Sequence, residues 1–315
     1  MSSTKVNYFN KYLGMMKNFS ALFVVIAAIL WGIDGIVLRP SLYSLPVPFV
    51  VFTGCAIVTI ILFPVLIKNF HFIRSLSKND LIAFFAVALI GEAVGTMAIT
   101  KALFYVNYIN LSIVILIQKL QPVFALLLAS ILLKEKLNKQ FFIWGGIAIA
   151  GAYLMTFGYS FPNFNTGDKT AIAALFAFVA AFSFGSSTVL SKIALKNVSF
   201  EVGTYLRFAF AAVILLFISI GTGDFNSFGS VTATQWIVFA LVALLTGGPA
   251  IFLYYYGLKR ISASIATICE LAFPLTAVIL EYIIHKNILS PVQWFGAAIL
   301  FTGIIKVSSL HINKN

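Results

Sequence analysis

Long apolar runs separated by short polar connections occupy almost the whole chain. A helix needs about 20 apolar residues to cross the roughly 30 Å hydrocarbon core of a membrane. Ten runs approach this length, and we expect each to form one membrane-spanning helix: 20–38, 49–67, 81–104, 111–133, 141–159, 170–192, 202–221, 236–258, 264–285 and 291–308. Since no connection is much longer than about 15 residues, the pattern predicts an all-α fold in which residues 1–315 form one polytopic membrane domain.

The second half of the chain repeats the first. Residues 109–151 align with residues 261–303 at a constant shift of 152 without a gap, and 11 of the 43 aligned positions are identical. The identical pairs include Ser112/Ser264, Pro122/Pro274, Leu137/Leu289 and Gly151/Gly303. Because each repeat (about 20–159 and about 170–308) would hold five helices, an odd number, we expect two repeats inserted in opposite orientations. Alternating-access transporters have this inverted architecture.

Composition and charge placement agree with a membrane protein. The chain is 61% hydrophobic and 10% charged, with a mean hydropathy of +1.03, whereas a soluble domain is about a quarter charged. The net charge of +12 does not indicate a nucleic-acid partner, because with a cytoplasmic N-terminus 15 Lys and Arg residues fall on the inner face and 3 on the outer face. This asymmetry predicts that both termini are cytoplasmic. Lys outnumbers Arg 17 to 4, which favours a bacterial source and therefore the cell inner membrane.

Neither a cleaved leader nor a metal or cofactor site is expected. Residues 1–18 are polar and basic, and the following apolar run lacks an A-x-A-like cleavage site, so we expect the first helix to be retained. Cys55 and Cys269 both lie in apolar runs, without the Cys/His spacing of a metal site.

A few polar residues lie inside the predicted helices, where an ionised side chain costs at least about 2.5–3.5 kcal/mol. We expect six of them to bind substrate in a central cavity: Lys119, Gln118, Gln121, Glu270, Lys101 and Glu92. The alternative is that ion pairs such as Lys119–Glu270 lock the helices together without a ligand. Arg207 lies about six residues into its helix and could instead extend to the cytoplasmic interface. The tyrosines at 254–256 are expected to be interface anchors, and stacking on the substrate is the alternative.

Matched prolines mark the same depth in both repeats. Gln118 and Glu270 are equivalent under the 152-residue shift, and each lies four residues before a proline, Pro122 or Pro274. Proline lacks a backbone donor and frees the carbonyl four residues earlier. We therefore expect Pro122 and Pro274 to be helix hinges beside the substrate site. The alternative is that both prolines only shape helix packing.

The same motifs carry a family resemblance. An A-x-x-W-G-like helix opens each repeat, at 28–32 and, without the Trp, at 181–185; a mid-helix proline is followed thirteen residues later by Glu135; and a glycine-rich helix follows at 145–151. The chain resembles the EamA-type family of the drug/metabolite transporter superfamily over nearly its full length. The resemblance implies two five-helix repeats and transport of a metabolite, but it does not name the substrate. One departure is Asn287, which occupies the position equivalent to Glu135.

These observations favour a secondary transporter over the other classes of protein. The chain has no H-E-x-x-H or G-x-S-x-G motif for an enzyme and no G-x-x-x-x-G-K-[ST] loop for ATP coupling. Unlike charges at mid-membrane make a poor ion channel, and a scaffold without transport activity remains the least favoured class. A gradient would then supply the energy, and desolvated Glu270 or Glu92 would be the proton carriers. Exchange without protons is the alternative.

Mixed charges at membrane depth favour a small polar substrate. An amino acid or a related zwitterion or anion is the first expectation. The alternative is a nucleotide-like metabolite, such as S-adenosylmethionine or a nucleotide sugar, with its anionic group held by Lys101 and Lys119. We expect a monomer or homodimer in the lipid bilayer.

Overall fold

The computed structural model describes residues 19–105, 117–118, 120–161, 170–285 and 290–312, and this part of the chain contains helices and no strand. The first half holds α2 (Ser20–Ile33), η1 (Asp34–Leu38), η2 (Arg39–Leu42), α3 (Val47–Ile61), α4 (Phe63–Lys68), α5 (Phe70–Arg74), α6 (Lys78–Val87), η3 (Ala88–Thr96), α7 (Met97–Tyr105), α9 (Gln121–Leu132) and α10 (Lys139–Phe157). The second half holds α11 (Thr170–Ala194), α12 (Phe200–Gly221), η4 (Asp224–Ser230), α13 (Ala233–Leu241), η5 (Val242–Gly247), α14 (Gly248–Leu258), α15 (Ala263–Cys269), α16 (Ala272–His285) and α17 (Pro291–Ile312).

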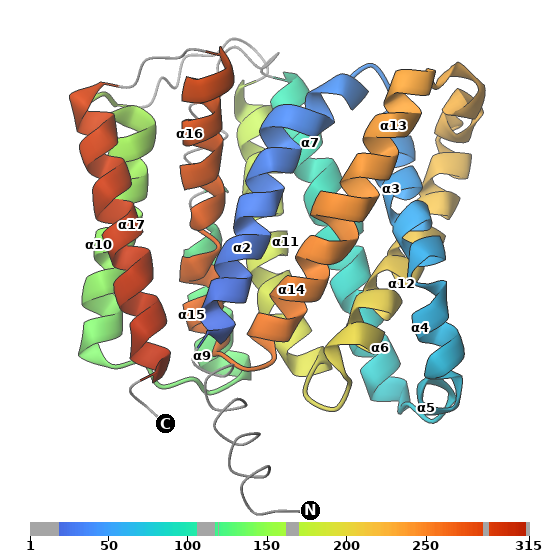
Figure 1. Ribbon diagram of the computed structural model, residues 1–315, viewed down its shortest axis with the longest axis horizontal. Helices are drawn as coiled ribbons and strands as arrows, with labels where there is room; N and C mark the ends of the chain where they lie inside the picture. Colours follow the sequence, from blue (N-terminus) through green and yellow to red (C-terminus); the bar gives the residue numbers. More distant parts are fainter. Residues whose placement is uncertain (1–18, 106–116, 119, 162–169, 286–289, 313–315) are drawn as a thin grey trace, which may run out of the picture.

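The helices stand side by side, and their directions reverse between the two halves (Figure 1). In the first half α2 rises from the lower side and α10 also ends at the upper side. In the second half α11 begins at the upper side, and α17 ends at the lower side. The first helices of the two halves therefore run in opposite directions, as an inverted repeat requires.

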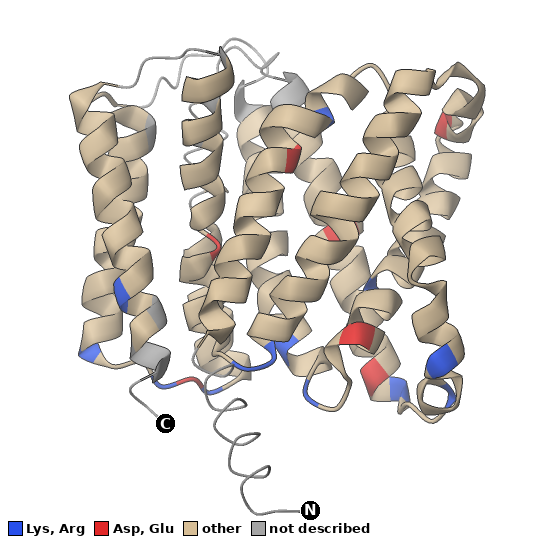
Figure 2. Ribbon diagram, viewed as in Figure 1, with Lys and Arg blue, Asp and Glu red and all other residues tan. Residues whose placement is uncertain are grey.

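Six helices in the described residues are long and apolar enough to cross a membrane: Ser20–Leu42, Lys78–Ala102, Ile172–Ala194, Phe200–Gly221, Ala233–Leu258 and Ala263–Ile284. Shorter apolar helices cover Val47–Ile61, Gln121–Leu132 and Pro291–Val307. The count of ten spans remains a prediction. Figure 2 shows that Lys and Arg gather at the lower ends of the helices, which is the side that the positive-inside rule would place in the cytoplasm.

Glycines at repeat-equivalent positions pack the two halves together. Gly32 on α2 contacts α16, because a Cβ atom there would lie 2.7 Å from the Thr276 Cβ. Gly185 on α11 contacts α9, where a Cβ would lie 2.8 Å from the Gln121 carbonyl oxygen and 3.0 Å from the Ala125 nitrogen. The first helix of each half thus packs closely on the proline-containing helix of the other half, which the absence of a side chain permits.

Two π-helical segments occupy equivalent places in the halves. η3 lies between α6 and α7, and η5 lies between α13 and α14. Gly95 in η3 and Gly247 in η5 differ by 152 residues, the same shift that relates the repeats. π-helical turns are rare and are frequent at functional sites. In this protein η3 carries Glu92.

Candidate functional site

Glu270 lies at a break between two helices. It is the C-cap of α15, and α16 begins two residues later. Because Pro274 has no N–H, the Glu270 carbonyl oxygen instead accepts a hydrogen bond from the Phe273 nitrogen, at 3.0 Å. The break places the side chain of Glu270 beside α9, α11 and α14 rather than along a continuous helix face.

Three neutral donors surround the Glu270 carboxylate. The Tyr254 hydroxyl donates to Oε1 at 2.7 Å, and the Thr188 hydroxyl donates to the same oxygen at 3.1 Å. The Gln121 amide donates to Oε2 at 2.8 Å. Within the described residues no Lys or Arg lies in salt-bridge range of this carboxylate. The Trp31 ring centroid lies 5.3 Å from that of Tyr254, so an aromatic pair borders the carboxylate.

A second carboxylate, that of the partly buried Glu92, has a different environment. Arg207 on α12 donates from Nε and Nη2 to Glu92 Oε1 on η3, at 2.9 and 2.6 Å. Its Nη1 donates to the Tyr255 hydroxyl at 3.2 Å, and that hydroxyl lies 3.1 Å from Ser191 Oγ. Gly91 lets η3 pack closely against α11, because a Cβ there would lie 2.9 Å from the Ser187 Cβ. Arg207 is buried in this network and does not extend to the membrane interface.

The predicted site residues divide into three groups. Gln121 and Glu270 contact each other directly, while Glu92 joins the separate network with Arg207. Lys101 is exposed, with its Nζ 5.9 Å from the Phe176 ring centroid, and the described contacts do not bring it to Glu270. Gln118, Pro122 and Pro274 make no described side-chain contact with either network; Pro122 is buried, and Gln118 and Pro274 are partly buried. Lys119 lies outside the described residues.

Several site residues were not identified from the sequence. Tyr254 and Tyr255 are buried hydrogen-bonding groups rather than the expected interface anchors. Thr188 and Ser191 belong to a set of hydroxyl residues on α11. The clustering of these Ser and Thr residues within an apolar run is the feature of the sequence that could have identified them. The buried members of this set are Ser183, Ser186, Ser187, Thr188 and Ser191. Such a stripe marks a helix face that turns away from lipid.

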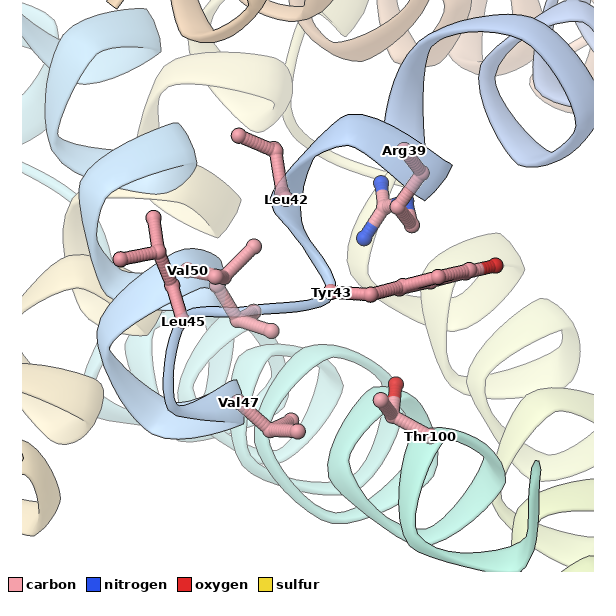
Figure 3. Close-up of a pocket in the computed structure, with 8 residues that line it drawn as sticks. Arg39, Leu42, Tyr43, Leu45, Val47, Val50 and Thr100 are labelled. Atoms are coloured by element: carbon pink, nitrogen blue, oxygen red, sulfur yellow. The ribbon is translucent and has the colours of Figure 1, made fainter. Parts of the chain in front are cut away.

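An ion pair at the end of α2 is separate from these networks. Arg39 Nε donates to Asp34 Oδ2 at 2.9 Å, and Arg39 Nη2 contacts the same oxygen. Figure 3 shows the small pocket beside this pair, with Arg39, Tyr43 and Thr100 contributing the polar side chains. Its other lining residues are apolar: Leu42, Leu45, Val47, Val50 and Val51. The pocket is too small to hold a metabolite.

Two halves of opposite orientation around buried polar networks are typical of membrane transporters. The model of the EamA-like transporter family matches residues 18–157 and 171–309, so the chain belongs to this family and is a transporter rather than an enzyme. The match confirms the resemblance drawn from the motifs.

Curated relatives and solved structures agree with this assignment. The riboflavin transporter ImpX of Fusobacterium nucleatum is 47% identical over 296 residues, which cover 92% of this chain and 98% of that protein. The uncharacterized transporter YwfM of Bacillus subtilis is 27% identical over 301 residues, which cover 94% and 95% of the two chains. One solved crystal structure superposes with a TM-score of 0.73 at 16% identity, over 94% of this chain and 97% of the other, which shows a shared fold.

Proposed function

We propose that this protein transports riboflavin across the bacterial inner membrane by alternating access. The observation that carries the proposal is the 47% identity to a riboflavin transporter over 98% of that transporter's length. Similarity at this level, without large insertions or deletions, supports a common substrate as well as a common fold. The ten-span inverted topology with cytoplasmic termini belongs to the same proposal, supported by the reversed helix directions and the charge asymmetry.

The residues around Glu270 suit a flavin. Riboflavin combines a flat aromatic ring system, whose edge carries amide-like donors and acceptors, with a chain of hydroxyl groups. Trp31 and Tyr254 offer aromatic surface for stacking, which favours offset or edge-to-face contacts. Gln121, Thr188 and Glu270 offer donors and acceptors next to that surface. Ligand sites typically combine apolar and aromatic walls with a few polar groups in this way.

The charges in the described core also favour a neutral substrate over a zwitterion. Arg207 is neutralised by Glu92, and Glu270 is hydrogen-bonded by neutral groups. A neutral flavin needs no unpaired charge in the protein. The amino acid and nucleotide-like substrates expected from the sequence are the alternatives, and both depend on Lys119 or Lys101 as an anchor for an anionic group.

We assign proton coupling, if the transport is proton-driven, to Glu270 rather than to Glu92. The Glu92 carboxylate accepts two hydrogen bonds from one guanidinium, so protonating it would leave a buried Arg207 without its counter-charge. Glu270 has only neutral partners among the described residues, so its charge can change without breaking an ion pair. The hinge role of Pro122 and Pro274 remains part of the proposal, supported by the helix break at Glu270.

Uptake of labelled riboflavin tests the proposed substrate. The protein would be expressed in bacterial cells that neither make nor import riboflavin, and uptake would be followed with and without competitors. We expect saturable uptake that unlabelled riboflavin blocks and that an amino acid mixture, S-adenosylmethionine or nucleotide sugars leave unchanged. Trp31→Ala should reduce uptake, whereas Trp236→Ala, which alters an aromatic cluster outside the Glu270 network, should not. Normal membrane accumulation without riboflavin uptake, or competition by amino acids, would refute riboflavin as the substrate.

A further inference from the structure

The short helix α15 connects two different places in the molecule. Ser262 caps its N-terminus by accepting a hydrogen bond from the Ile265 nitrogen at 3.2 Å, and Glu270 is its C-cap. At about 1.5 Å per residue, the 7 residues of Ala263–Cys269 span about 10 Å, and every one of them is buried. A displacement at one end of this short buried helix is therefore transmitted to the other end.

Glu135 from the first half binds the N-terminus of α15 through its carboxylate. Its Oε1 accepts a hydrogen bond from the Ala263 nitrogen at 2.8 Å. Its Oε2 accepts one from the Ser264 nitrogen at 3.1 Å and one from the Ser264 hydroxyl at 2.5 Å. A carboxylate is favoured at a helix N-terminus, where unpaired N–H groups point outward and the helix dipole is positive. Hydrogen bonds to an ionised acceptor are also the stronger kind.

The backbone before Glu135 is shaped for this contact. Lys134 has a φ of 54°, and it is the only non-glycine residue with positive φ in the described part of the chain. The Glu135 nitrogen then donates to the Ala129 carbonyl oxygen at 3.3 Å, which closes the end of α9. This left-handed turn ends α9 and lets the Glu135 carboxylate reach α15 in the other half. Left-handed backbone is unfavourable for a residue such as lysine, so the turn persists because its surroundings hold it.

A second contact closes the same end of the molecule. Lys192 Nζ, near the end of α11, donates to the carbonyl oxygens of Leu258 and Lys259 at 2.7 and 3.0 Å. These carbonyls belong to the C-terminal end of α14, where a cation is favoured. The ends of α9, α11, α14 and α15 are therefore joined by side chains bound to helix termini, on the side that carries most of the positive charge (Figure 2).

We propose that Glu135 is the latch of the inner gate, and that α15 couples this latch to Glu270. With Glu135 bound to Ala263 and Ser264, the inner ends of the two halves are held together and the site at Glu270 is closed to the cytoplasm. Opening to the cytoplasm requires this contact between the halves to break. The proposal rests on alternating access, which is part of the proposed function, but it does not depend on the identity of the substrate.

The 152-residue shift relates Glu135 to Asn287 and Ser264 to Ser112, and both of these equivalents lie outside the described residues. The latch proposed for Glu135 therefore concerns the inner side of the protein.

Cys269 is a native reporter for this gate. It lies beside Glu270 and is fully buried in this structure. In a Cys55→Ser background, inside-out membrane vesicles would be treated with a charged, membrane-impermeant thiol reagent, and the labelling rate of Cys269 would be measured. For Glu135→Gln we expect a rate about fivefold to tenfold higher, the ratio that corresponds to a favourable helix-terminus charge. Lys136→Gln, which changes an exposed neighbouring charge, should leave the rate unchanged.

If Cys269 is labelled at the same rate in the Cys55→Ser background and in its Glu135→Gln variant, the proposal is wrong. It is also wrong if Lys136→Gln raises the labelling rate as much as Glu135→Gln does, because the increase would then reflect a general loosening of the structure. If Glu135→Gln does not accumulate, Ser264→Ala tests the same contact from its other side by removing one hydrogen bond. A rate about tenfold higher is then expected, because this hydrogen bond has a charged acceptor, and an unchanged rate refutes the latch. Labelling needs no substrate, so a failure of riboflavin uptake would leave this result standing.

Discussion

Glu92 and Glu270 both lie in helices that could span a membrane, and their surroundings differ. Glu92 faces a guanidinium in an ion pair with Arg207, whereas Glu270 faces a phenol, an alcohol and an amide. Tyr254 and Tyr255 are adjacent in the sequence but belong to different networks. Tyr254 donates to Glu270, and Tyr255 accepts from Arg207, the partner of Glu92. From this comparison we propose that the two carboxylates have different roles. Glu92, held by a permanent cation, would belong to the scaffold, whereas Glu270, held by neutral donors, could change its charge during a transport cycle.

The largest effect should come from breaking the ion pair. Arg207→Gln leaves the partly buried Glu92 without its cation, and removing one partner of a fully buried pair costs about 3–5 kcal/mol, an upper bound for this one. We expect a large fall in thermal stability in detergent and poor accumulation in the membrane. The double variant Glu92→Gln/Arg207→Gln should recover part of the loss, because no unpaired charge remains. An Arg207→Gln protein as stable as the original would show that the pair does not hold η3 to α12.

Glu270→Gln should affect transport rather than stability. The amide keeps the size of the side chain and can still accept from Tyr254 and Thr188, so we expect stability to change by no more than about 1 kcal/mol. In proteoliposomes, exchange of substrate should continue while gradient-driven uptake is lost, since the amide cannot release a proton. Driven uptake at its original steepness would remove the coupling role from Glu270. Loss of exchange and driven uptake together would instead indicate that Glu270 only binds substrate.

The adjacent tyrosines give a matched pair of smaller changes. Tyr254→Phe removes a hydrogen bond to Glu270, and Tyr255→Phe removes one to Arg207. Each should lower stability by about 0.5–1.5 kcal/mol, the usual value of one hydrogen bond. Only Tyr254→Phe should also reduce the rate of riboflavin uptake. Equal effects of the two variants on uptake, at equal protein levels, would mean that the two networks do not have separate roles.

Lys101→Gln should have the smallest effect. Lys101 is exposed, and its described contact is with the Phe176 ring, an interaction of about 0.5–1 kcal/mol at exposed sites. We expect riboflavin uptake with an unchanged KM. A several-fold rise in KM would restore Lys101 to the substrate site and favour a substrate with an anionic group.

The helical architecture and the repeat could be predicted because they depend on patterns that are local or self-similar. The partner of each buried charge could not be predicted, because Arg207 and Glu92 are 115 residues apart and nothing periodic relates them. The repeat equated Gln118 with Glu270, yet Gln121 makes the contact with Glu270. A tight turn precedes α9, in which the Leu120 nitrogen donates to the Ile117 carbonyl oxygen at 3.0 Å, and Gln121 is the first residue of the helix after it.

The wide turns of η3 and η5 also carry information about the history of the chain. A π-helical turn holds an additional residue, and one residue corresponds to a rotation of about 100° in an α-helix. Deleting one residue from η3 would turn the following α7 by that angle relative to α6, so such deletions should be selected against. A turn acquired late would occur in one half only. Its presence at the same repeat position in both halves, with Gly95 and Gly247 aligned, is the outcome expected if the ancestral repeat unit already contained it before the two halves arose by duplication.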